Sequence, residues 1–65
     1  MIQPTRRQLQ ILRRVAEGDT LRQIALDLGL ANGTVKNQML KMRRRIGARS
    51  SENAVAIAMR EGWIS

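Results

Sequence analysis

Neither a disulfide bond nor a histidine-bound metal can support the fold of this chain, because its 65 residues include no cysteine and no histidine. A chain of this length buries only a small core. Its apolar residues are Leu, Ile, Val, Met and Ala, with one Trp and no Phe or Tyr. We therefore expect a single all-α domain over residues 1–65, held together by helix packing alone.

Capping signals divide the chain into four predicted helices, each of which starts after a polar cap and ends at or before a glycine. Two threonines are followed three residues later by a glutamine, which is the spacing of a capping box: Thr5 with Gln8 and Thr20 with Gln23. The other predicted caps and stops are Asn32, Ser50 or Ser51, Gly18, Gly29, Gly47 and Gly62. The predicted helices cover residues 6–16, 21–28, 33–46 and 52–61.

Positive charge is concentrated in one segment of the chain. Between Leu28 and Ser51 there is no acid, while the segment contains Lys36, Lys41, Arg43, Arg44, Arg45 and Arg49. The whole chain has a net charge of +7. Uncompensated charge of this kind attracts polyanions, although a basic helix face can also serve only to keep a small protein in solution. Without Phe or Tyr to stack bases, single-stranded RNA is the less favoured polyanion.

The third predicted helix has one apolar side and one polar side. At 100° per residue, the side chains that cluster on one side are those of Val35, Met39, Met42 and Ile46, and we expect them to pack in the core. Lys36, Asn37 and Leu40 point elsewhere. Asn pairs with adenine, Lys donates to guanine, and an aliphatic group meets the thymine methyl, so we expect these three residues to lie near base edges in a major groove. Asn37 alone could be an ordinary exposed amide, but an exposed Leu between charges gains nothing in water.

Three arginines follow toward the C-terminal end of the same helix: Arg43, Arg44 and Arg45. Arginines spread around a helix end would meet phosphates and fix orientation without reading sequence. Since Gly29 joins the second and third predicted helices, the pattern favours a helix-turn-helix that reads double-stranded DNA.

The chain resembles the LuxR/GerE-type helix-turn-helix domain of bacterial transcriptional regulators, from Thr5 to Ile64. The resemblance lies in Ala16-Glu17-Gly18, Ile24-Ala25, Leu28-Gly29, Gly33-Thr34-Val35-Lys36-Asn37, Ile46-Gly47, Ala54-Val55-Ala56 and Gly62. It implies a four-helix bundle whose third helix is the recognition helix. It also implies that further residues lie near phosphates, namely Thr20, Arg22, Thr34, Lys41 and Arg44.

The chain departs from this family at four positions. The family usually has serine where this chain has Ala31 and histidine where it has Gln38, so the helix cap and the buried hydrogen bond expected there are weakened. It usually has an acid in place of Asn32 and an aliphatic residue in place of Arg43, and these two departures add basic character.

The fourth predicted helix has two apolar sides. We expect Val55, Ala58 and Met59 to face the core, and the outward stripe to consist of Ala54, Ile57 and Glu61. In the resembled family this helix forms a two-fold dimer contact on DNA, so the stripe is the expected dimer face. The alternative is that a small domain simply leaves an Ile exposed. Trp63 and Ile64 are expected to fold back on the bundle.

Two classes of function remain. The favoured one is a bacterial, sequence-specific transcriptional regulator that binds double-stranded DNA as a homodimer and contacts or blocks RNA polymerase. The alternative is a module like a sigma-factor region, or an adaptor, that acts mainly through protein partners.

Other classes are disfavoured. Without His, Cys or Tyr, and with five scattered acids, we expect no enzyme, no cofactor and no metal site. No apolar stretch is long enough for a membrane span and no signal peptide is evident, so we expect a cytoplasmic, nucleoid-associated protein. Met1 directly before the domain favours a stand-alone chain over an excised part.

Overall fold

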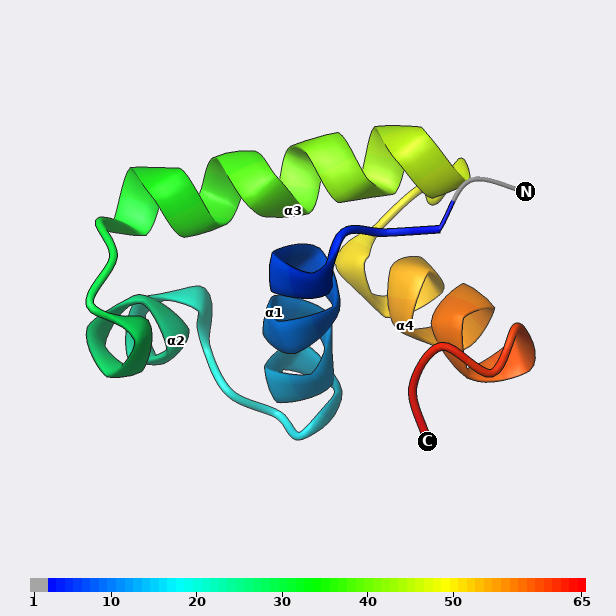
Figure 1. Ribbon diagram of the computed structural model, residues 1–65, viewed down its shortest axis with the longest axis horizontal. Helices are drawn as coiled ribbons and strands as arrows, with labels where there is room; N and C mark the ends of the chain where they lie inside the picture. Colours follow the sequence, from blue (N-terminus) through cyan, green and yellow to red (C-terminus); the bar gives the residue numbers. More distant parts are fainter. Residues whose placement is uncertain (1–2) are drawn as a thin grey trace.

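The computed structural model of the chain describes residues 3–65, which form four helices and no strand (Figure 1). They are α1 (Arg6–Ala16), α2 (Leu21–Leu28), α3 (Asn32–Ile46) and α4 (Ser51–Arg60). The all-α prediction is confirmed. The first two helices have the predicted boundaries, α3 begins one residue early, and α4 is shifted by one residue toward the N-terminus. None of the helices in the described part combines the length and hydrophobicity that crossing a membrane requires.

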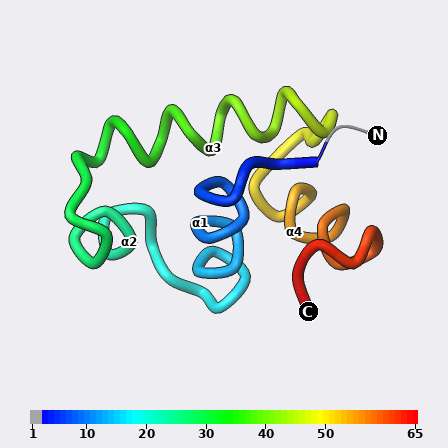
Figure 2. The backbone as a smooth tube through the Cα atoms, viewed as in Figure 1, coloured from blue at the N-terminus to red at the C-terminus, as the bar shows by residue number. Residues whose placement is uncertain are grey.

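The longest helix, α3, forms one whole side of the molecule. In the view of Figures 1 and 2 it lies along the top, and α1 stands beneath its middle with its N-terminal end uppermost. α2 lies below the N-terminal end of α3, and α4 lies below its C-terminal half. Because the other three helices all lie below α3, the upper side of α3 stays open.

The core is apolar and draws on all four helices. Its buried members are Ile11 and Leu12 from α1, Ile24 and Ala25 from α2, Val35, Met39 and Met42 from α3, Ala54 and Ala58 from α4, and Ile64. Trp63 packs against this cluster and is partly buried. Trp63 and Ile64 therefore fold back on the bundle, as predicted.

The capping box at the start of α1 is complete. The Thr5 hydroxyl accepts from the Gln8 amide at 3.2 Å, and the Gln8 side-chain oxygen accepts from the Thr5 amide at 2.9 Å. The predicted second box is only half present. The Thr20 hydroxyl accepts from the Gln23 amide at 3.1 Å, but the Gln23 side chain donates to Asp27 at 2.9 Å. In a complete box the Gln23 side-chain oxygen would accept from the Thr20 amide. The Gln23 side chain is instead turned toward the Asp27 carboxylate one turn along α2.

The predicted Asn32 cap is wrong. The cap residue of α3 is Ala31, which has no side-chain capping bond, and Asn32 is the first helical residue. The backbone amides of Thr34 and Val35 both donate to the Ala31 carbonyl, so the helical hydrogen bonds begin one residue earlier than predicted. At α4, Ser50 is the cap, and its hydroxyl accepts from the Asn53 amide at 3.0 Å.

The predicted outward stripe of α4 is also wrong for two of its three members. Ala54 is fully buried and Ile57 is 8% exposed, whereas Met59, expected in the core, is 56% exposed. Ala58 is buried as predicted, Val55 is half-buried, and Glu61 is exposed. α4 packs against both α1 and α3, and alanines at 54 and 58 present the smallest apolar side chains to them. Because the helix has two apolar sides, the positions of α1 and α3 decide which side is buried. A helical wheel gives no information about where neighbouring helices lie.

Candidate nucleic-acid interface

The side chains of α3 separate into a buried and an open side. Val35, Met39 and Met42 are 0%, 3% and 0% exposed. The residues predicted to read bases, Lys36, Asn37 and Leu40, are all exposed, and Leu40 keeps 39% of its surface accessible. We call these three residues the reading face. An exposed leucine set between exposed polar side chains matches the mixed chemistry of a major groove.

A tight glycine turn sets α3 against α2. Gly29 has φ +68°, in the left-handed region that favours glycine, and the Leu30 amide donates to the Ala25 carbonyl at 2.8 Å. α3 then starts after Ala31. The two helices are packed together, so residues 21–46 form the predicted helix-turn-helix.

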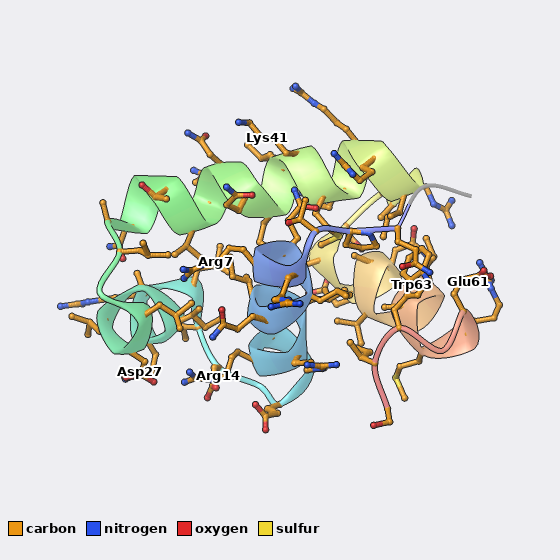
Figure 3. The ribbon with its side chains drawn as sticks, viewed as in Figure 1. Arg7, Arg14, Asp27, Lys41, Glu61 and Trp63 are labelled. Carbon is orange, nitrogen blue, oxygen red and sulfur yellow. The ribbon has the colours of Figure 1, made fainter. Side chains whose placement is uncertain are left out.

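The residues predicted to meet phosphates fall into two groups. Six of the seven are exposed, and Arg43 is half-buried. The first group consists of the five whose side chains donate no hydrogen bond within residues 3–65, namely Thr20, Arg22, Thr34, Lys41 and Arg44. In Figure 3 Lys41 projects from the upper side of α3, away from the bundle. These five are free to meet a polyanion that approaches α3, except that the Thr20 hydroxyl already accepts the capping bond.

The other two members, Arg43 and Arg45, are held by the protein. The Arg43 guanidinium donates from Nη2 to the Arg49 carbonyl at 2.6 Å, and its Nε is buried without a partner. Arg45 donates from Nη1 to the Gln3 carbonyl at 3.3 Å. Of the three consecutive arginines, Arg44 alone makes no side-chain hydrogen bond within residues 3–65. A helical wheel spreads the three evenly and does not reveal this difference.

Three of the five acids are paired with a cation of α1 and not with α3. Within residues 3–65 every ion pair involves Arg14 of α1, whose partners are Glu17, Asp19 and Asp27. Hydrogen bonds from Arg14, and then from Gln23, lower the pKa of Asp27, and the bonds to Asp27 and Asp19 raise the pKa of Arg14. Figure 3 shows Arg14 and Asp27 on the side of the molecule away from α3. Because no ion pair within residues 3–65 involves a cation of α3, the positive potential along this helix is not neutralised by paired acids and attracts a polyanion.

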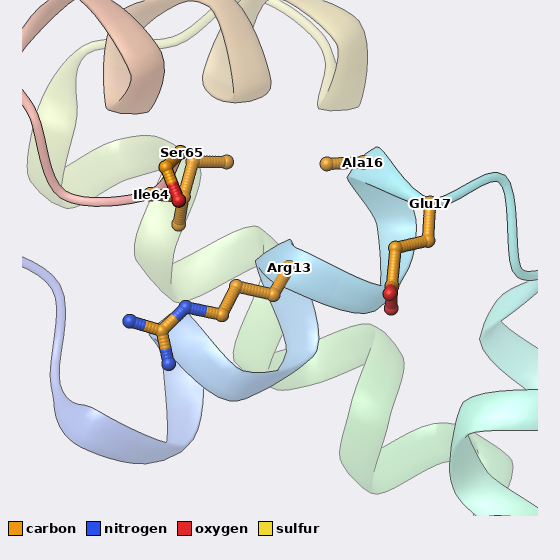
Figure 4. Close-up of a pocket in the computed structure, with 5 residues that line it drawn as sticks. All are labelled: Arg13, Ala16, Glu17, Ile64 and Ser65. Carbon is orange, nitrogen blue, oxygen red and sulfur yellow. The ribbon is translucent and has the colours of Figure 1, made fainter.

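The candidate site is an open surface and not a cavity. A cavity of about 190 Å³ lies between the end of α1 and the C-terminal residues, lined by Arg13, Ala16, Glu17, Ile64 and Ser65 (Figure 4). That volume is below the range of about 300–1,000 Å³ of typical small-molecule sites. The described residues hold no group of three acids that could bind a metal.

One hydrogen bond beside this surface joins α1 to α3. The departure from histidine at Gln38 was expected to weaken a buried hydrogen bond, and the Gln38 side-chain oxygen accepts from Gln8 Nε2 at the long distance of 3.3 Å. The two residues are 30 positions apart. Gln8 was identified only as part of a capping box, and nothing local in the sequence pairs it with Gln38.

Comparison with known proteins agrees with this geometry. The model of the family described as "Bacterial regulatory proteins, luxR family" matches residues 4–58. Among curated proteins, the chain is 38% identical over 60 residues to the "Uncharacterized transcriptional regulatory protein YvfU" of Bacillus subtilis, covering 92% of the chain. It is 37% identical over 63 residues to the "Transcriptional regulatory protein YdfI" of the same organism, covering 97% of the chain. It is also 37% identical over 59 residues to the "Response regulator RamR" of Streptomyces coelicolor, covering 91% of the chain.

The matched region is a small part of each relative. The chain spans 30%, 30% and 29% of the lengths of these three proteins. No solved structure gave a significant match. The family match covers most of the chain and extends from the residue before the Thr5 cap into α4. The chain belongs to the luxR family of bacterial regulatory proteins, a non-enzymatic family of DNA-binding helix-turn-helix domains.

Proposed function

We propose that the chain reads a specific double-stranded DNA sequence by placing α3 in the major groove. The observation that carries this proposal is the reading face: Lys36, Asn37 and Leu40 are exposed together, opposite the buried Val35–Met39–Met42 side. Lys36 donates to guanine, Asn37 pairs with adenine, and Leu40 contacts a thymine methyl. An α-helix fits the width of this groove.

The remaining exposed polar residues position the helix. Thr34, Lys41 and Arg44 of α3, with Thr20 and Arg22 at the start of α2, contact phosphates on either side of the groove. Arg43 and Arg45 add charge to the same region, and in the free protein they donate to the Arg49 and Gln3 carbonyls. Contacts of this kind add affinity without selecting sequence.

We also propose that two copies bind DNA side by side through the exposed side of α4. Because Ala54 and Ile57 are buried, the face available for this contact consists of Val55, Ala56 and Met59. This face is smaller than the roughly 1,000 Å² of total burial that a stable interface needs, so the free protein is a monomer and DNA holds the pair together. A two-fold pair would place its α3 helices about one DNA turn apart, near 34 Å.

In this account the chain supplies the DNA-binding part of a transcriptional regulator that acts at the nucleoid in the cytoplasm. Bound at a promoter, it contacts or blocks RNA polymerase. The luxR match and the regulators among its relatives support this proposal over a module that works mainly through protein partners.

Selection from a pool of random duplexes tests this function. The proposal predicts that the isolated chain enriches one short motif, that a footprint on this motif covers the major groove, and that the motif occurs as two half-sites with two-fold symmetry. Retention of all duplexes equally, or of none, would remove the sequence-reading function and leave the protein-partner module as the better explanation.

A further inference from the structure

The side-chain amide of Gln8 in α1 forms hydrogen bonds through both its oxygen and its nitrogen. The residue is buried, with only 4% of its surface exposed. The oxygen Oε1 accepts from the Thr5 amide at 2.9 Å, and Nε2 donates to Gln38 Oε1 in α3 at 3.3 Å. Since the capping bond needs an acceptor, it fixes which end of the amide faces Thr5. The donor end is thereby aimed at α3.

The apolar side of α3 does not fix the rotation of the helix sharply. Burial of apolar surface is non-directional, and two of the three fully packed side chains of α3 are the methionines Met39 and Met42. Methionine is unbranched and adapts its shape to the space available. Such a contact tolerates small rotations of α3 about its own axis.

Small rotations matter for base reading. Side chains extend to about 5–6 Å from a helix axis, so a rotation of roughly 20° moves their tips by about 2 Å. A shift of that size takes a donor and acceptor out of hydrogen-bond distance. A directional contact is therefore needed to keep Lys36 and Asn37 in register with base edges.

The Gln8–Gln38 hydrogen bond is a directional contact of this kind, and it lies next to the reading face. Gln38 directly follows Asn37 and lies two residues before Leu40, so it belongs to the same turn as the reading face. Its side chain is half-buried on the flank of α3 that meets the first turn of α1. The other end of the link is the complete capping box, in which the Gln8 side chain accepts from the Thr5 backbone amide.

We propose that the Gln8–Gln38 amide pair is a positioning element that sets the rotation of α3 and thereby the sequence discrimination of the protein. The proposal rests on the reading face assigned above. Neither glutamine touches a base. Their contribution is to the ratio between affinity for the best site and affinity for random DNA, which we call the discrimination ratio.

The test compares three variants of the full chain. Gln38→Met removes the acceptor while keeping the length of the side chain and the net charge. Gln8→Glu keeps the capping acceptor, and the Gln38 amide can turn to donate to the new carboxylate, so the link is retained. Gln10→Met is the matched control, because Gln10 is exposed on α1 and makes no side-chain hydrogen bond within residues 3–65. For each variant, Kd is measured on the selected site and on random duplex, and unfolding is measured separately.

The two possible roles of the pair give different results. We expect Gln38→Met to lower the discrimination ratio by about tenfold, comparable to the loss of one base contact, while Gln8→Glu and Gln10→Met stay within about twofold of the wild type. A purely structural role would lower the folded fraction, which weakens both Kd values by the same factor and leaves the ratio unchanged. An unchanged ratio for Gln38→Met would therefore overturn the proposal.

The discrimination ratio of the wild-type chain shows whether the positioning role or the proposed function itself has failed. If the wild type shows no discrimination, the reading face itself is wrong, whatever the glutamine variants do. If the wild type discriminates and Gln38→Met does so equally well, only the positioning role is lost.

Discussion

Arg14 in α1 donates hydrogen bonds both to Asp27, in the last turn of α2, and to Asp19 in the connection between the two helices. Gln23 donates to the other oxygen of Asp27 at 2.9 Å. The carboxylate is thus held from two sides, and it ties α2, the first helix of the helix-turn-helix, to α1. The Arg14 and Asp27 side chains are 26% and 42% exposed, so salt screens this network in part.

The first prediction concerns the pH dependence of stability. Because the pKa of Asp27 is lower in the folded protein than its ordinary value of 3.8, the ionised form stabilises the fold above that pH. This contribution is lost as the pH falls through the folded-state pKa. Asp27→Asn should lower the melting temperature at pH 7 and flatten the loss of stability below about pH 4 in thermal unfolding.

Glu61→Gln is the control for this prediction, since Glu61 is exposed and forms no ion pair within residues 3–65. It should change the melting curve less than Asp27→Asn does. If the two variants were equally stable at pH 7, the Arg14 network would contribute nothing to the fold.

A second prediction concerns salt. The cations of α3 replace counterions on the phosphates, so the logarithm of the affinity should fall steeply with the logarithm of the salt concentration, with a slope of about −4 to −8 for two bound copies. Fluorescence anisotropy on one duplex at several salt concentrations gives the slope. A value near zero would contradict binding through phosphates.

Gly33 gives a prediction of increased stability. It lies in the first turn of α3, its backbone is not left-handed, and an added Cβ would meet nothing within 4 Å. Gly33→Ala should therefore raise the free energy of unfolding by about 0.5–1 kcal/mol. Gly47→Ala is the contrasting variant, because Gly47 has φ +74°, and it should destabilise the protein in the same denaturant titration. Destabilisation by both changes would contradict the assigned backbone at Gly33.

The proposed dimer contact predicts a loss of cooperativity. Met59→Glu places two like charges close to the two-fold axis, so it should abolish cooperative filling of paired half-sites and leave affinity for one half-site largely unchanged. Leu26→Glu adds the same charge at a side chain that is 68% exposed on α2, and it should leave cooperativity intact. Gel-shift titrations on duplexes with one and two half-sites measure both effects. Cooperative filling by Met59→Glu would place the contact elsewhere.

The sequence predicted those parts of the fold that depend on local signals. Thr5, Gly29 and Gly47 mark helix ends through their own side chains or backbone freedom, and they lie where predicted. The exposure of Lys36, Asn37 and Leu40 was also predictable, since α3 has a single apolar side and that side packs in the core.

Features that depend on contacts between distant residues were missed. α4 carries apolar residues on two sides, so the burial of Ala54 and exposure of Met59 depend on where α1 and α3 approach. The side chains of Gln8 and Gln38 meet only after α1 and α3 have packed. The Arg43 bond to the Arg49 carbonyl is closer in sequence, but it depends on the path of the backbone after α3 ends, which helical periodicity does not describe.

The central claim, that the open side of α3 reads bases, is tested most directly by comparing Asn37→Ala with Arg44→Ala on the selected site and on random duplex. Asn37→Ala should cost about 1–3 kcal/mol of binding energy on the selected site and much less on random DNA, because it removes a contact to a base edge. Arg44→Ala should weaken binding to both by similar factors, because a phosphate contact carries no base information. Equal losses on both duplexes for Asn37→Ala would show that α3 does not read sequence through this face.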